Sequence, residues 1–260
     1  INQAMKGCRS VLHLAALIGI PYSYLSPHAY LDTNIKGTYN VLEAARLLDY
    51  ERVLVTSTSE TYGTAQYVPI DEKHPPVGQS PYAATKVAAD QLALSYHMSF
   101  GLPVTIARPF NTYGPRQSSR AIIPTIISQV LAGHRTLKLG NLDPTRDLTY
   151  VRDTAGGIVE VACCDAFLGS ATNIGTNSEI SVRDLVGQIL ALLREDVEII
   201  TDPERVRPED SEVERLVCDN TRLQKHTDWR PEHDLRSGLE KTIGFVREHL
   251  DDYKPSIYTV

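Results

Sequence analysis

The sequence is poor in the features that mark secreted, membrane-spanning or nucleic-acid-binding proteins. Its 260 residues include only four cysteines, none in C-x-x-C spacing, so neither a disulfide framework nor a cysteine metal site is indicated. Apolar runs are short and broken by Gly, Pro or charge, so no signal peptide or spanning helix is predicted. The net charge of -6 argues against nucleic acid or an anionic membrane as a general partner. We expect a soluble, cytoplasmic protein with buried free thiols, and we assign no metal ligands.

The first half of the chain alternates apolar, β-branched runs with helical segments. Strands are predicted over residues 10–16, 52–56 and 102–107, and helices over residues 33–48 and 80–100. The run at 10–16 has the composition of a strand buried on both faces. This alternation indicates an open α/β fold with a parallel sheet.

Beyond about residue 115 the alternation is less regular, which suggests a smaller lobe that closes over the sheet. The segments predicted here are helices at 121–132, 152–164, 181–194, 221–225 and 235–250, and strands at 136–139, 148–151, 172–175 and 197–200.

The segment Pro-Tyr-Ala-Ala-Thr-Lys places Tyr82 and Lys86 four residues apart at the head of a helix, and therefore on one helix face. A nearby cation favours the phenolate of a tyrosine. Such a tyrosine can take a proton from a hydroxyl while hydride leaves the same carbon. The same spacing also occurs by chance on solvated helix faces, so the motif needs support from its neighbours.

Two polar loops follow predicted strands. Residues 57–63 read Ser-Thr-Ser-Glu-Thr-Tyr-Gly, and residues 108–115 read Arg-Pro-Phe-Asn-Thr-Tyr-Gly-Pro. Open parallel sheets bind ligands beyond the carboxyl ends of their strands, which is where both loops fall. The alternative for the first loop is a Ser/Thr-rich turn that caps the next element.

Four features stand in one order: His13-Leu14-Ala15-Ala16, residues 57–63, Tyr82 with Lys86, and residues 108–115. Together they resemble the extended short-chain dehydrogenase/reductase family, in its NAD-dependent nucleotide-sugar epimerase and dehydratase branch. The resemblance extends to Thr145-Arg146-Asp147 and to Arg207-Pro208-Glu209-Asp210. Through residues 17–24 and 108–117 the chain is most similar to the N-acetylglucosamine 4,6-dehydratases of legionaminic-acid biosynthesis.

This resemblance implies a Rossmann-like, doubly wound parallel sheet in residues 1–115 that binds NAD. Residues 116–260 would mainly form a substrate-binding lobe, with some segments returning to the first domain. Family members open with a strand, a Gly-rich turn and an acidic residue that hold NAD. The chain contains none of these and is expected to begin near the fourth strand. We favour a missing N-terminal part over a polypeptide that cannot hold NAD by itself.

The resemblance also implies roles for individual residues. Tyr82 takes the proton of the sugar 4-hydroxyl, Lys86 tunes it, Thr58 bonds the same hydroxyl, and Glu60 is the base that removes the C5 proton. Many dehydratases carry an acidic Asp where this chain has Ser59, so the acid for the 6-hydroxyl is left open. The residues expected to bind NAD are Leu14, Ala15, Ala16, Asn34, Thr56, Ser57, Tyr82, Lys86 and Pro109, and those expected to bind the substrate pyrophosphate are Asn111, Arg146 and Arg207.

Several assignments stay open at this stage. Arg146 and Arg207 have a structural ion pair as their alternative role. His13 is expected to be a strand histidine satisfied by backbone. Tyr22 and Tyr24 either face the sugar or pack in the core or a lid.

Three other functions compete with the dehydratase. A nucleotide-sugar 4-epimerase shares Tyr82, Lys86 and NAD, but usually carries a small residue at the Glu60 position. A UDP-glucuronate decarboxylase can also read Thr-Ser-Glu, although residues 17–24 do not resemble its sequence. A truncated scaffold or dinucleotide sensor without turnover is the third. The helices over 33–48 and 80–100 carry apolar residues beyond one core-facing stripe, so a homodimer is expected.

Overall fold

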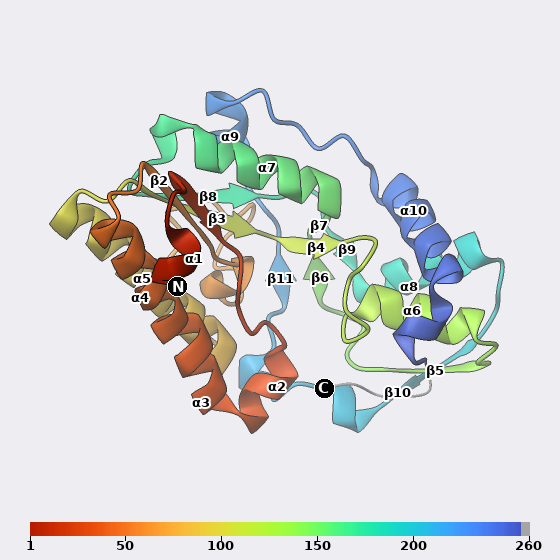
Figure 1. Ribbon diagram of the computed structural model, residues 1–260. Coiled ribbons are helices and arrows are strands. Elements are labelled where there is room, and N and C mark those ends of the chain that lie inside the picture. The colour runs from red at the N-terminus through yellow and green to blue at the C-terminus, as the bar shows by residue number, and fades with distance from the viewer. Residues whose placement is uncertain (256–260) are drawn as a thin grey trace.

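The computed structural model describes residues 1–255, and its centre is a four-stranded parallel sheet (Figure 1). The strands are β1 (Ser10–His13), β2 (Arg52–Thr56), β3 (Val104–Pro109) and β8 (Ala171–Ile174), in the order β1-β2-β3-β8. Val53 of β2 lies opposite Val11 of β1 on one side and Val104 of β3 on the other. The fold class predicted from the sequence, α/β with a parallel sheet, is confirmed.

The inner strands are buried on both faces, whereas β1 lies at the edge of this sheet. Val53, Leu54 and Val55 of β2 are each at most 1% exposed. On β1, by contrast, Leu12 is 43% exposed. The prediction of a doubly buried strand over residues 10–16 is therefore wrong. The strand ends at His13 and pairs within this sheet only with β2, so its side chains have fewer neighbours to cover them.

Helices α4 (Gly37–Leu47) and α5 (Pro81–Phe100) cover one face of the sheet. The start of α5 is set by Ser80, whose hydroxyl accepts a hydrogen bond from the Ala83 backbone at 3.1 Å, and by a proline in the first turn. The helix ends at Gly101, whose φ of 69° is a left-handed conformation that favours glycine. The helix predicted over residues 33–48 is α4 preceded by a π-helical segment, η1 (Leu31–Lys36).

Helices α7 (Val151–Cys163) and α9 (Thr221–His226) cover the opposite face, although they come from the second half of the chain. Successive side chains of β2 point to opposite faces of the sheet, so β2 packs against both layers of helices. Leu54 packs with Ile158 of α7 and with Trp229, while Val53 and Val55 pack toward α4 and α5. Strand β8 and these two helices thus return from the later sequence to complete the sheet and its cover.

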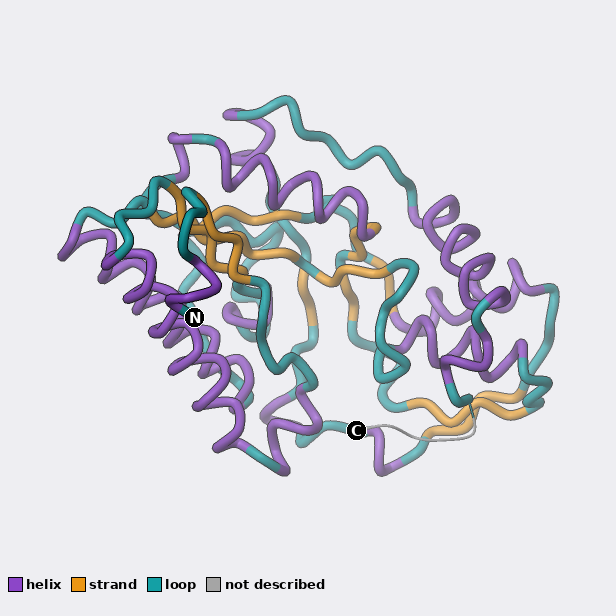
Figure 2. The backbone as a smooth tube through the Cα atoms, viewed as in Figure 1, coloured by secondary structure: helices purple, strands orange, loops and turns teal. Residues whose placement is uncertain are grey.

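A second hydrophobic core lies to one side of the sheet, beyond β4 and β7 (Figures 1 and 2). It is built from α6 (Ile122–Leu131), α8 (Val182–Leu193), α10 (Leu235–Glu248) and the parallel pair β5 (Thr136–Leu139) and β10 (Glu198–Thr201). Ile123, Ile126 and Ile127 of α6 show the helical spacing that produces a buried stripe. Figure 2 shows the loop between α9 and α10 running from the sheet region to this lobe.

Short elements connect these layers. The remaining strands are β4 (Asn111–Tyr113) with β7 (Leu148–Tyr150), and β11 (Arg215–Leu216), β6 (Thr145–Arg146) and β9 (Ile180–Ser181). The remaining helices are α1 (Asn2–Met5), α2 (Ile20–Leu25), α3 (Pro27–Tyr30), η2 (Ser59–Tyr62), η3 (Asp165–Phe167), η4 (Pro203–Arg205), η5 (Glu209–Ser211) and η6 (Leu250–Tyr253).

Among the described residues, none of the helices has the length and apolar character needed to span a bilayer. The cysteines are free, as expected, but the prediction that they are buried is wrong for three of them. Cys8, in the turn between α1 and β1, and Cys163, at the end of α7, are exposed. Cys164 is half-buried, while Cys218 is buried.

Candidate active site

The segments that follow β1, β2 and β3 lie at the same edge of the sheet, because parallel strands end together. Two of them carry the polar loops predicted from the sequence. The second of these strands leads directly into η2, which contains Ser59 and Glu60. Helix α5 presents its first two turns, with Tyr82 and Lys86, to the same region, since it contacts both η2 and β3.

Tyr82 lies in a buried environment that keeps it neutral. It is 5% exposed and packs edge-on against Tyr30, with ring centroids 6.2 Å apart. Burial raises the pKa of the Tyr82 phenol, a hydrogen bond with the Thr58 side chain lowers it, and the charge of Glu60 raises it. The expected preference for phenolate is not met in this arrangement, because burial outweighs the opposing hydrogen bond. The structure does bring Tyr82, Thr58 and Glu60 together, as the sequence predicts.

Lys86 is buried beside the end of β2. Its Nζ donates a hydrogen bond to the main-chain oxygen of Thr56 at 2.6 Å. Burial lowers the pKa of the ammonium, and the Asp90 carboxylate one turn further along α5 opposes that shift. The buried Asp90 carboxylate therefore favours the charged form of Lys86.

Glu60 and Ser59 are held on η2 in a buried position. Thr58 caps this short helix, with its Oγ1 accepting a hydrogen bond from the Glu60 backbone at 3.3 Å. Ser59 is 2% and Glu60 is 7% exposed. The charge of Glu60 acts on both Tyr82 and Arg146. Glu60 is thus near both the group expected to handle the sugar 4-hydroxyl and one expected to bind the pyrophosphate.

His13 is held by a side chain rather than by the backbone, which corrects the sequence expectation. The Thr38 hydroxyl donates to the Asn34 carbonyl at 2.6 Å, so its oxygen accepts the proton of His13 Nε2 at 3.1 Å. Burial, and next the charge of Lys86, lower the pKa of His13 to about 4. The imidazole is therefore neutral at physiological pH.

Asn34 acts within the fold rather than presenting its amide to a ligand. It is 1% exposed, and its side chain bonds both backbone groups of Leu17 at 2.8 and 2.9 Å. It also donates to Thr85 on α5 at 3.1 Å. Asn34 therefore fixes the segment after β1 against α5, and any influence on a cofactor passes through that segment.

The other residues assigned to the cofactor lie at the ends of the first three strands. Leu14 is 57% exposed and Ala15 is also exposed, so apolar surface follows β1. Thr56 ends β2, and its buried Oγ1 has no hydrogen-bond partner within residues 1–255. Ser57 donates instead to Asp90 at 2.8 Å. Ala16, next along from Ala15, and Pro109, at the end of β3, are half-buried.

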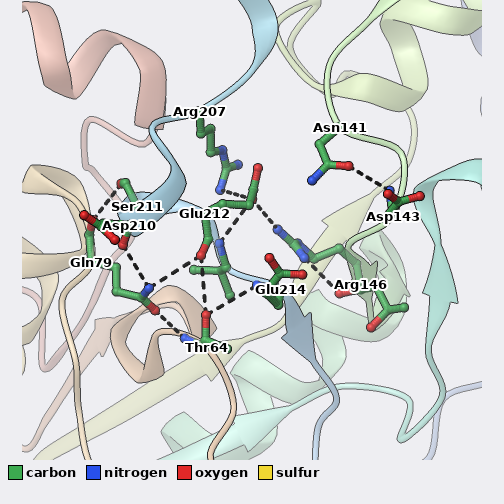
Figure 3. Close-up of polar contacts among 12 residues, drawn as sticks. Thr64, Gln79, Asn141, Asp143, Arg146, Arg207, Asp210, Ser211, Glu212 and Glu214 are labelled. Atoms are coloured by element: carbon green, nitrogen blue, oxygen red, sulfur yellow. Dashed lines mark hydrogen bonds and ion pairs between the residues drawn. The ribbon is translucent and has the colours of Figure 1, made fainter.

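The two arginines assigned to the pyrophosphate share one carboxylate oxygen (Figure 3). Arg146 and Arg207 each lie 3.4 Å from Oε1 of Glu212. Burial lowers the pKa of Arg146, the charge of Glu60 raises it, and that of Arg207 lowers it. Among the described residues, Glu212 is the one carboxylate that pairs directly with both guanidinium groups. The alternative role expected for Arg146 and Arg207, a structural ion pair, is therefore present as well.

The segment that carries Arg207 and Glu212 is fastened to the loop after η2 (Figure 3). Ser211 donates to the Gln79 carbonyl at 2.6 Å, and Tyr24 bonds the Ser211 hydroxyl at 2.7 Å. Tyr24 therefore holds this segment, and Tyr22 packs with Tyr30 at 6.1 Å between ring centroids. Asn111 lies on β4, and its buried Oδ1 has no hydrogen-bond partner among the described residues.

Sequence reasoning missed two residues of this region. Asp90 lies four residues after Lys86, so the spacing that identified Tyr82 and Lys86 extends one further turn and points to it. Glu212 stands in an acidic stretch with no distinctive spacing, so no comparable signal was available. In the part of the chain that the structure describes, no cluster of His, Cys, Asp and Glu is suited to hold a metal ion.

Residues 2–242 match the family model described as GDP-mannose 4,6 dehydratase. The dTDP-glucose 4,6-dehydratase of Streptomyces griseus is 32% identical over 256 residues, which cover 98% of this chain and 77% of that protein. The UDP-glucose 4-epimerase of Mycolicibacterium smegmatis is 34% identical over 241 residues, covering 91% and 75%. The crystal structure of a dTDP-glucose 4,6-dehydratase from Streptomyces venezuelae, with NAD bound, matches with a TM-score of 0.90 and 29% identity over 98% of this chain and 78% of that one.

Proposed function

Because the chain belongs to the GDP-mannose 4,6-dehydratase family of nucleotide-sugar dehydratases and epimerases, we propose that it is an NAD-dependent nucleotide-sugar 4,6-dehydratase. The proposed reaction converts GDP- or UDP-N-acetylglucosamine into the 4-keto-6-deoxy sugar nucleotide. The similarity of residues 17–24 and 108–117 to the dehydratases of legionaminic-acid biosynthesis supports the choice of sugar.

The observation that carries this proposal is the position of Glu60. A redox-neutral epimerase needs groups that act at C4, and Tyr82 with Thr58 supplies them. A dehydratase also needs a base for the C5 proton. The buried Glu60 carboxylate lies close enough to Tyr82 to alter its pKa, and a positioned base of this kind is typically worth about 10²–10⁴ in rate.

The residues present fit the nicotinamide end of NAD. Lys86 is a buried cation beside Thr56, whose Oγ1 is a buried polar atom without a partner among the described residues, and apolar surface at Leu14 lies nearby at the end of β1. When bound, NAD supplies the hydride acceptor at C4 and the hydride donor at C6.

The protein groups handle the protons of the reaction. The Tyr82 phenol first loses its own proton to solvent, and the resulting phenolate removes the 4-hydroxyl proton while Thr58 holds that oxygen, so that a ketone forms at C4. The ketone acidifies the C5 proton, which Glu60 removes. The 6-hydroxyl leaves as water after taking a proton, and the protonated Glu60 is the donor that we propose in place of the Asp found where this chain has Ser59. When hydride returns to C6, C5 takes a new proton that comes from solvent.

Binding of the nucleotide diphosphate is assigned to Arg146, Arg207 and Asn111. The fork geometry of arginine suits paired phosphate oxygens. The two guanidiniums share Glu212 through contacts of 3.4 Å, which are long for charge-assisted hydrogen bonds and leave them able to re-pair with a phosphate.

The 4-epimerase is the second candidate, and the similarity to epimerases favours it. Tyr82, Lys86 and NAD would serve either reaction, whereas the carboxylate of Glu60 has no role in epimerisation. A UDP-glucuronate decarboxylase can also carry Thr-Ser-Glu and is a weaker alternative because residues 17–24 do not resemble its sequence. A non-catalytic dinucleotide sensor is weaker because it does not explain Glu60 beside Tyr82.

The test is to incubate the full-length protein and NAD with GDP- and UDP-N-acetylglucosamine in deuterium oxide. A dehydratase gives a 4-keto-6-deoxy product with deuterium at C5. Recovery of only the C4 epimer, without deuterium at C5, would replace the proposal with the epimerase. Loss of carbon dioxide from UDP-glucuronate would support the decarboxylase.

We also propose that the protein forms a homodimer through η1, α4 and α5. Large apolar side chains are exposed on these helices, among them Tyr39 at 45%, Leu47 at 60% and Phe100 at 57%. A shallow depression of about 450 Å³, lined in part by Leu31 and Leu92, lies between them. Light scattering should give the mass of a dimer, and Tyr39→Asp should shift it toward the monomer.

A further inference from the structure

A chain of buried polar side chains joins the helix that carries Tyr82 and Lys86 to the short helix that carries Glu60. Its members are Asp90 on α5, Arg108 on β3 and Tyr62 on η2. Asp90 is 1%, Arg108 is 7% and Tyr62 is 0% exposed. None of these three side chains is among the groups that handle the protons of the proposed reaction.

Asp90 is the first link of this chain. Its Oδ2 accepts hydrogen bonds from Arg108 Nε at 3.1 Å and from Arg108 Nη2 at 2.8 Å. The same oxygen accepts from the Ser57 hydroxyl at 2.8 Å, which ties the end of β2 to α5. The Asp90 charge also acts on Lys86, one turn earlier on the same helix.

Tyr62 is the second link. Arg108 Nη1 donates to its hydroxyl oxygen at 3.0 Å, and that hydroxyl donates to Oδ1 of Asn173 on β8 at 2.7 Å. Burial raises the pKa of the Tyr62 phenol to about 12, so the neutral O–H is the form that makes both bonds. Arg108 therefore bonds Asp90 of α5 through Nε and Nη2, and Tyr62 of η2 through Nη1.

Glu60 stands two residues before Tyr62 in a 3-10 helix of four residues, so an anchor at Tyr62 fixes the direction in which Glu60 projects. The next residue, Gly63, has a φ of 65°, and a Cβ there would lie 2.8 Å from the Val77 carbonyl oxygen. The backbone after η2 is thus also constrained. The Tyr62 hydroxyl supplies the polar link between this constrained turn and the sheet.

We propose that Arg108 and Tyr62 are positioning residues that set Glu60 against Tyr82 and Lys86, so that C4 oxidation and C5 deprotonation occur on one bound sugar. This inference rests on the proposed function. Burying a charge pair is costly, and a role in fixing one geometry accounts for its presence better than a net gain in stability. C4 oxidation depends on Tyr82 and Lys86 of α5 and on Thr58, which stands before η2. C5 deprotonation also depends on the direction of Glu60 within η2.

The test is Tyr62→Phe, which removes the hydroxyl and keeps the ring that packs on Phe110 and His74 at centroid distances of 6.4 and 5.4 Å. With GDP- or UDP-N-acetylglucosamine, reduction of bound NAD should stay within about twofold of the unsubstituted protein. Deuterium exchange at C5 and release of product should fall at least tenfold. Tyr67→Phe is the matched control, because exposed Tyr67 bonds Asp71 through its hydroxyl, outside this chain of residues, and the change should affect neither step.

Arg108→Lys provides a second variant, since a lysine keeps the charge opposite Asp90 but cannot serve Asp90 and Tyr62 together. It should show the same split between the two steps. If Tyr62→Phe slows both steps equally, or neither, the positioning role is wrong and the residues are structural. If the unsubstituted protein neither reduces bound NAD nor exchanges C5, the proposed function itself fails, which is a distinguishable result.

Discussion

The Glu60 carboxylate acts on the Tyr82 phenol through space, and its negative charge raises the pKa of that phenol. Both side chains are buried, at 7% and 5% exposure, so their interaction is weakly screened. The charge state of one group therefore affects the proton transfer carried out by the other. When Glu60 takes up a proton, the phenolate of Tyr82 becomes easier to form.

Replacing Glu60 with Gln should separate the two halves of the proposed reaction. Glutamine keeps the shape and hydrogen-bonding capacity but removes the base. The variant should still bind substrate and reduce bound NAD, while deuterium incorporation at C5 and product release fall by a factor of about 10² or more. Stopped-flow absorbance of reduced NAD and mass spectrometry of the sugar measure the two steps.

Tyr82→Phe provides the contrast, because no alkoxide can form at C4 without the phenol. It should abolish both NAD reduction and product. Unchanged deuterium incorporation at C5 in Glu60→Gln would mean that another residue is the base, and Glu60 would no longer distinguish a dehydratase from an epimerase.

Gly238 in α10 is a position where a single methyl group should reduce stability. A Cβ there would overlap the Tyr113 ring and hydroxyl, and that hydroxyl donates to the Leu235 carbonyl at 3.1 Å. Gly238→Ala should lower the free energy of unfolding by about 1–3 kcal/mol through overpacking. Gly244, in the same helix, has open space, so Gly244→Ala should raise it by up to about 1 kcal/mol. Urea titration checks both, and equal effects would contradict the overlap.

Local signals predicted the elements well. The helix predicted over residues 80–100 is α5, which runs from Pro81 to Phe100. Its ends are set by the local effects of Ser80, Pro81 and Gly101 on the backbone. The π-helical turn at Leu31–Lys36 has no periodicity that separates it from α4, so it was missed. Burial of β1 was wrong because burial depends on neighbouring strands and not on the composition of the strand itself.

In the candidate site, too, local relations were predicted and long-range contacts were not. Tyr82 and Lys86 were identified because their relation is one helical turn, and the meeting of their helix with residues 57–63 followed from the rule about strand ends. The link from Arg108 to Tyr62 joins residues 46 positions apart, and that from Arg146 to Glu212 joins residues 66 apart. Spacing carries no information on such pairs, so only the fold reveals them. The chemical roles of all these residues stay predictions.

His13 should make the stability of the protein depend on pH. Its pKa is lowered from 6.5 to about 4 in the folded chain, so between these values the unfolded state binds a proton that the folded state does not. Stability should therefore fall as pH drops from about 6.5 to about 4, with no further contribution below that range. His13→Gln keeps a donor for Thr38 and should lose this component. Melting temperatures of both proteins at pH 7 and pH 4.5 test it, and an equal drop in both would contradict it.

Glu212→Gln should strengthen binding of free GDP or UDP. The substitution keeps a side-chain acceptor for the Val213 backbone, which lies 3.1 Å from Glu212 Oε1, but removes the charge that Arg146 and Arg207 share. A diphosphate then no longer competes with the carboxylate that pairs directly with these two guanidiniums. A half-buried ion pair is worth on the order of 1 kcal/mol, so the gain in affinity should be about three- to tenfold.

Calorimetric titration measures this gain, and two further variants define its cause. Glu214→Gln removes the same charge from an exposed position two residues away and should change affinity by less than the Glu212 variant, because long-range charge effects are screened. Arg207→Gln should weaken diphosphate binding. Weaker or unchanged binding in Glu212→Gln would show that its carboxylate does not compete with the ligand. In that case Glu212 would serve to orient the arginines, because two cations that repel each other need a shared anion to stay aimed at one site.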